Sequence, residues 1–104
     1  MIRAAFKMKL KPGNEAEYKK RHDEIWDELV KVLEQAGVSD YSIYLDKETN
    51  TLFAFQKLED DNTADKLPEN PVVKKWWDYM ADLMETNPDK SPVCINLDEV
   101  FHMD

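Results

Sequence analysis

The sequence predicts one α+β domain of the ferredoxin-like βαββαβ type, a four-stranded antiparallel sheet with two helices on one face. The chain has 104 residues, which suits a single domain with one modest core. Hydrophobic residues make up 42% and aromatic residues 11% of it, which argues against disorder although 35% of residues are charged. Strand-like and helix-like periodicities follow one another in the order strand, helix, strand, strand, helix, strand.

The first half of the predicted fold is a strand followed by a long helix. Apolar and charged residues alternate over residues 2–10, which is typical of a half-buried strand. Asn14, with Glu17 three residues later, predicts a capping-box start for a helix over residues 14–36 that ends at Gly37. The inward-facing stripe at helical spacing is Tyr18, His22, Ile25, Leu29, Val32 or Leu33, and Ala36.

A hairpin is predicted next. Residues 41–45 and 51–55 are rich in aromatic and β-branched side chains, and they flank a turn-rich segment at 46–50. The acidic and polar residues 59–70 then predict a loop, with a short helical turn before Pro68.

The second helix is expected to begin at Asn70-Pro71, because proline favours the first helical position. Its inward face is Val73, Trp76, Trp77, Met80, Leu83 and Met84. A rigid loop at residues 87–92 then leads to a last strand over residues 93–97.

The third strand predicts a homodimer. It offers Leu52 and Ala54 to one face of the sheet and Phe53 and Phe55 to the other, so both faces require burial. Two helices cover only one face of four strands. A second copy packed on the other face would complete a dimeric α+β barrel.

Composition excludes several classes of function. The net charge of −8 leaves no basic surface for nucleic acid. The one run of basic residues, at 19–21, is followed closely by acidic residues. The chain has no signal-peptide pattern and no apolar stretch of membrane-span length. Cys94 is the only cysteine, which fits a reducing compartment, so we expect a cytoplasmic protein.

No cofactor and no metal are expected. His102 is far in sequence from His22, and neither lies in a metal-ligand spacing. The chain has only two glycines and no glycine-rich phosphate loop.

Six aromatic or imidazole side chains are candidates for a site. His22 titrates near neutral pH and could transfer a proton, but a core histidine with a satisfied hydrogen bond is the competing interpretation. Tyr18 lies one turn before it and Trp26 one turn after it, and hydrophobic packing is the default for both. Trp76 and Trp77 point about 100° apart on their helix, so one could pack in the core and the other could line a pocket.

Tyr41 opens the second strand and could reach the same cavity. Alternatively, it shields the edge of the sheet.

Four segments resemble the L-rhamnose mutarotase family. They are the run Tyr18–Trp26, with its R-H-x-x-I-W pattern, and Tyr41–Asp46, Lys75–Met80 and Asn87–Val93. The resemblance extends over essentially the whole chain and is weakest over residues 59–70. It implies a ferredoxin-like dimer that interconverts the α and β anomers of L-rhamnose.

In that family pattern, His22 matches the catalytic acid/base. Tyr18, Tyr41, Trp76 and Trp77 match sugar-contacting positions, whereas Trp26 remains a packing residue. The second proton could be carried by a tyrosine hydroxyl, a carboxylate or a water. Two other functions remain open: a cofactor-independent oxygenase on the same dimeric fold, and a sugar-binding dimer without catalysis.

Overall fold

The alternation of the first strand places it inside a four-stranded antiparallel sheet. The computed structural model describes residues 1–104 and orders the strands β2-β3-β1-β4. Their bounds are β1 (Ile2–Lys9), β2 (Val38–Asp46), β3 (Thr51–Leu58) and β4 (Ile95–Asn96). This confirms the predicted α+β class and the hairpin of β2 and β3.

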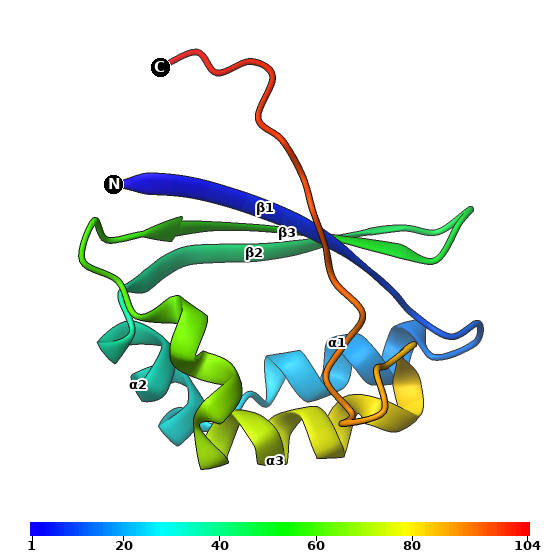
Figure 1. The fold of residues 1–104 in the computed structure, drawn as a ribbon. Coiled ribbons are helices and arrows are strands. Elements are labelled where there is room, and N and C mark those ends of the chain that lie inside the picture. Colours follow the sequence, from blue (N-terminus) through cyan, green and yellow to red (C-terminus); the bar gives the residue numbers. More distant parts are fainter.

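All helices lie on one face of the sheet (Figure 1). They are α1 (Glu15–Asp23), α2 (Asp27–Gln35), α3 (Pro71–Met80) and two short 3-10 helices, η1 (Ala64–Glu69) and η2 (Ala81–Leu83). The core lies between these helices and the sheet; its largest fully buried side chains are Leu10 and Leu52. No helix is both long enough and apolar enough to cross a bilayer.

The prediction of one continuous helix over residues 14–36 was wrong. The chain leaves helical geometry after Asp23, and Trp26 is extended, with φ −66° and ψ 132°, before α2 begins at Asp27. Asp27 and Glu28 occupy the first turn of α2, where acidic side chains interact favourably with the helix dipole. Three α-helices therefore cover the sheet, instead of the two that we expected.

The two predicted helix starts differ in outcome. Asn14 does precede α1, but its side chain makes no capping hydrogen bond, and Glu17 pairs with Arg21 at 2.8 Å instead of closing a capping box. Asn70 does cap α3: its Oδ1 accepts a hydrogen bond of 2.8 Å from the backbone N–H of Val72. Pro71 follows at the first helical position, as predicted.

The second face of the sheet has no helix over it. Phe55 pairs with Ala5 and Ser42 across the sheet, and its side chain is 45% exposed on this open face. β4 has only two residues, Ile95 and Asn96, so the predicted strand over residues 93–97 was too long. Beyond it, the C-terminal segment leaves the sheet on the side away from the helices (Figure 1).

Candidate functional site

The floor of the candidate site is the helix-facing side of the sheet. Ala54 on β3 is 0% exposed, and its small side chain leaves room for a larger one to lie across it. Tyr41 reaches from β2 across β3 to β1, where its ring meets Phe6 edge-on at 6.4 Å. A register shift between Ser39 and Ser42 redirects β2 at this point.

Helix α1 provides Tyr18 and His22, one turn apart on the same side. Their ring centroids are 4.3 Å apart, and Nδ1 of His22 lies 3.1 Å from the backbone carbonyl oxygen of Tyr18. A neutral imidazole that donates its Nδ1–H to this carbonyl keeps its lone pair on Nε2. The hydrogen bond therefore fixes both the orientation and the tautomer of His22.

Helix α3 provides Trp76, which is only 8% exposed. Its ring meets that of His22 edge-to-face, with centroids 5.4 Å apart and planes at 88°. On its other side it contacts Trp26 at 5.1 Å and Tyr79 at 5.9 Å. Trp76 is thus both a member of the core and a direct neighbour of the imidazole.

The pKa values of two tyrosine hydroxyls, one on a helix and one on the sheet, are linked. Burial raises the pKa of Tyr18 well above its usual 10, and the nearby Tyr41 and Cys94 raise it further. Burial also raises the pKa of Tyr41, with a smaller contribution from Cys94. Tyr18 of α1 and Tyr41 of β2 are therefore close enough for their charges to interact.

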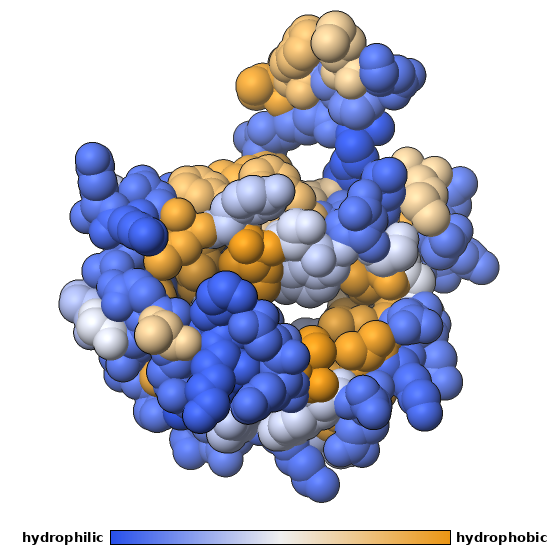
Figure 2. All heavy atoms as spheres, turned by 180° about the vertical axis from the view of Figure 1, so that it is seen from behind, coloured by the Kyte–Doolittle hydropathy of each residue, from blue (hydrophilic) through white to orange (hydrophobic).

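The space between the sheet and the helices is open to solvent, and we refer to it as the cavity. Tyr41 is 39% exposed although burial dominates the pKa of its hydroxyl. The exposure and the raised pKa are compatible if many protein atoms lie around the hydroxyl of Tyr41 while solvent still reaches part of the side chain. Figure 2 shows the surface hollowed between the sheet above and the helices below, with hydrophobic residues around the hollow.

Burial also decides the charge of His22. The half-buried imidazole has a pKa lowered below 6.5, chiefly because burial disfavours its charged form. The Tyr18 carbonyl and the carboxylate of Asp23 raise this pKa without cancelling the effect. His22 is therefore neutral at neutral pH and ready to accept a proton.

Cys94 is a member of this group that we did not predict. Asn96 pairs with Phe6 and Ile95 pairs with Lys7, so the antiparallel register continues to place Cys94 opposite Met8 on the helix side of the sheet. Its pKa is raised by burial, so the thiol is neutral at pH 7. The strand alternation indicated this side, but no local motif marked the residue.

Trp26 and Trp77 lie around this group in different ways. Trp26 is half-buried against the core and stacks on Tyr79 at 5.6 Å, as expected of a packing residue. Trp77 is half-buried and makes none of the aromatic contacts of the structure; it faces a small gap beside Met84 and Pro92. The structure thus brings together Tyr18, His22, Tyr41 and Trp76, but not Trp77.

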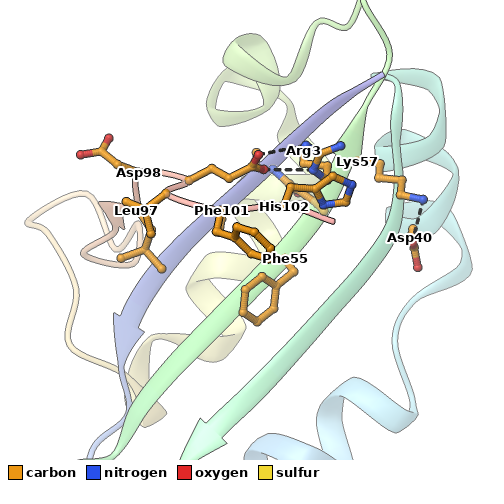
Figure 3. Close-up of a pocket in the computed structure, with 13 residues that line it drawn as sticks. Arg3, Asp40, Phe55, Lys57, Leu97, Asp98, Phe101 and His102 are labelled. Atoms are coloured by element: carbon orange, nitrogen blue, oxygen red, sulfur yellow. Dashed lines mark hydrogen bonds and ion pairs between the residues drawn. The ribbon is translucent and has the colours of Figure 1, made fainter. Parts of the chain in front are cut away.

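A separate cavity of about 460 Å³ lies on the open face of the sheet, under the C-terminal segment. Figure 3 shows Phe55 and Phe101 beside it and Arg3 bound to the neighbouring carboxylate of Glu99. Its histidine, His102, is exposed and pairs with Asp104 at 2.8 Å. This cavity has no buried proton-transfer group, so its size alone does not make it the chemical site.

No three or more His, Cys, Asp or Glu side chains are grouped closely enough to hold a metal ion. The groups available for chemistry between the layers are one imidazole, two hydroxyls and a thiol. Such a set can move protons and donate hydrogen bonds to a polar ligand.

Comparisons with known proteins agree on one family. The family profile described as L-rhamnose mutarotase matches residues 3–103. An L-rhamnose mutarotase of Bacteroides thetaiotaomicron is 65% identical over all 104 residues and the whole of both chains, and one of Rhizobium johnstonii is 65% identical over 95% of this chain and 93% of its own. A crystal structure of L-rhamnose mutarotase from Formosa agariphila has a TM-score of 0.93 and 57% identity, with both chains fully covered.

Proposed function

Because the chain belongs to the L-rhamnose mutarotase family, which are isomerases, we propose that it interconverts the α and β anomers of L-rhamnose and that His22 transfers the proton. The observation that carries the proposal is a neutral, half-buried imidazole whose Nε2 is free in a cavity lined by hydroxyls and aromatic rings. Ring opening requires a positioned side chain that can accept a proton and later return it.

Ring opening needs one proton removed from the anomeric hydroxyl and one delivered to the ring oxygen. In this mechanism, Nε2 of His22 accepts the first proton, a second group donates a proton to the ring oxygen, and the C1–O5 bond breaks to give the open aldehyde. Rotation about C1–C2 exposes the other face of the carbonyl. The O5 hydroxyl then attacks that face and returns its proton to the second group, while His22 returns its proton to the anomeric oxygen.

A tyrosine hydroxyl is the preferred second group among the three that we considered. Raised pKa values keep Tyr18 and Tyr41 protonated through neutral pH, so each can donate to the ring oxygen as its charge develops. The nearest carboxylate on α1, Asp23, is exposed and is paired with Lys19 at 2.9 Å. It is therefore poorly suited to the role.

The energy required is modest. Spontaneous mutarotation over minutes to hours corresponds to a barrier of roughly 21–23 kcal/mol, and a turnover of about 100 per second to a barrier near 15. Acid–base catalysis contributes about 10²–10⁴-fold, or roughly 3–5 kcal/mol, and positioning of the sugar can contribute the remainder. Trp76 offers an apolar surface for this positioning. Trp77 stays a predicted sugar contact.

Saturation-transfer NMR on L-rhamnose tests the proposal, because it observes binding and anomer exchange in one sample. We expect His22→Ala to lower the exchange rate about 10²–10⁴-fold. His102→Ala, which alters the exposed histidine, is the matched control and should retain the wild-type rate. Exchange at the wild-type rate in His22→Ala would contradict the assignment, and binding without exchange in the wild type would favour a non-catalytic sugar-binding dimer.

We also infer a cytoplasmic homodimer that packs through the open face of the sheet. Tyr44 is 64% and Phe55 is 45% exposed there, and Phe101 beyond them is 78% exposed, which leaves an apolar surface that a monomer would present to water. Phe55→Asp is expected to lower the sedimentation coefficient from that of a dimer to that of a monomer. A wild-type protein that sediments as a monomer would refute the inference.

A further inference from the structure

We propose that Arg21 is the positioning residue that holds α1 against the end of α3 and thereby sets His22 against Trp76. This role rests on the proposed function of His22. The hydrogen bonds of Arg21 go to Glu17, the Tyr79 carbonyl and Asp82, so it acts through its neighbours and not on the sugar.

Helix α1 needs such an anchor because apolar packing holds it weakly. It has nine residues, and Tyr18 is the only buried one among them. A helix this short is not stable by itself in water. It is also not continuous with α2, because the chain is non-helical between Asp23 and Asp27.

Arg21 joins α1 to two later elements. Its Nη1 donates to the backbone carbonyl of Tyr79 at 2.6 Å and to Oδ1 of Asp82 at 2.9 Å, and its Nε donates to Glu17 at 2.8 Å. Only 13% of the side chain is exposed. The guanidinium thus connects α1 with the last turn of α3 and with η2 in a fixed planar geometry.

The charge at this anchor is permanent. The hydrogen bond from Arg21 to Asp82, and to a smaller extent the one to Glu17, raises the pKa of Arg21. The bond between Arg21 and Asp82 also lowers the pKa of Asp82. Its partners cover the guanidinium, but it lies close to the molecular surface, so solvent screens these ion pairs. The contribution of Arg21 is therefore mainly geometric.

A chain of ring contacts leads from Arg21 to the site. The guanidinium carbon lies 4.4 Å from the centroid of the Tyr79 ring. Tyr79 contacts Trp76 at 5.9 Å, and Trp76 contacts His22 at 5.4 Å. Arg21 and His22 are also consecutive on α1, where neighbouring side chains point about 100° apart. One helix therefore directs its cation to α3 and its imidazole to the cavity.

The experiment measures both turnover and the position of the imidazole in Arg21→Gln. We expect kcat for anomer exchange to fall at least tenfold, with KM changed less than threefold. The imidazole Hε1 resonance of His22 should also move, because its ring-current shift depends on its place beside Trp76. Arg21→Lys should recover part of kcat. Lys19→Gln is the control, because Lys19 pairs only within α1 and is 78% exposed; it should change neither readout.

Two results would overturn the role of Arg21: wild-type kcat with an unmoved His22 resonance, or a lower kcat with that resonance unmoved. If Arg21→Gln does not fold, Asp82→Asn is judged by the same two readouts. It weakens the ion pair by changing Asp82, whose side chain is 67% exposed. A moved resonance with wild-type kcat would support the anchor and instead refute His22 as the proton carrier. The two proposals can therefore fail separately.

Discussion

Anomer exchange is expected to fall in acid at a pH below that at which an ordinary histidine titrates. Burial lowers the pKa of His22 below 6.5, so the imidazole stays neutral further into the acid range. In the proposed mechanism only the neutral form offers a lone pair on Nε2. kcat/KM should therefore be flat above about pH 7 and should fall about tenfold per pH unit once the pH is below the pKa of His22.

The same shift predicts the direction in which stability depends on pH. The folded state binds the proton of His22 less readily than the unfolded chain does, so the unfolded state carries more protons between the two pKa values. The contribution of His22 to the free energy of unfolding is fully present above about pH 6.5 and is lost as the pH falls through the folded pKa. Each unit of separation between the two values corresponds to about 1.4 kcal/mol.

Proton NMR can follow both histidines of the chain in one titration. His102→Gln assigns the signals by removing the exposed histidine, and its exchange profile should match that of the wild type. Exchange is measured by saturation transfer at each pH, with the enzyme-free rate subtracted. A His22 midpoint at or above 6.5, or an exchange rate that stays constant while His22 takes up its proton, would refute the reasoning.

Three further substitutions test the hydroxyl of Tyr18 and the backbone at the two glycines. Tyr18→Phe keeps the ring that packs on the imidazole and removes the hydroxyl; we expect about tenfold slower exchange, the equivalent of one hydrogen bond, with an unchanged melting temperature. Full activity would show that the hydroxyl is not used. Gly37→Ala should lower the free energy of unfolding by about 1–3 kcal/mol, because φ is +89° and the new Cβ would lie 3.0 Å from Cβ of Asn62. Gly13 has a similar φ of +87°, but an added Cβ would meet nothing within 4 Å, so Gly13→Ala should lower the free energy of unfolding by less in denaturant titrations. Equal losses for the two variants would show that the close contact with Asn62 does not matter.

Local signals in the sequence predicted much of the fold. The alternation of residues 2–10 and the hairpin of residues 41–55 required only periodicity and turn composition, and both were confirmed. The start of α3 was confirmed because Asn70 and Pro71 act within one helical turn. Such signals depend on near neighbours, so they can be read without knowledge of the tertiary structure.

The break between α1 and α2 was missed although the charges indicated it. Acidic residues begin α1 and basic residues end it, and the acidic pair Asp27 and Glu28 then begins α2. This repeated charge pattern matches two helix dipoles and not one. The inward stripe concealed the break, because apolar residues continue at compatible spacing on both sides of it.

The position of Tyr41 could not be predicted from local signals. It depends on a register shift in β2, where Asp40 has φ 47°, and on the size of Ala54 in the neighbouring strand. The first condition belongs to strand pairing and the second to the strand order. Tyr41 was proposed as a site candidate from its place at the start of the second strand and from the family resemblance, and the structure places its ring beside Phe6 at 6.4 Å.

Trp76 shows why aromatic residues left the choice between core and pocket undecided. In the structure this residue is 8% exposed within the core, and its ring also meets that of His22 edge-to-face. In a domain with one small core, the wall of the site has to be the edge of that core. Loss of activity in a Trp76 variant would therefore combine lost packing with loss of the proposed sugar contact. Substitutions that leave the core intact, such as Tyr18→Phe, separate these two effects, because they change a polar atom while the ring stays in place.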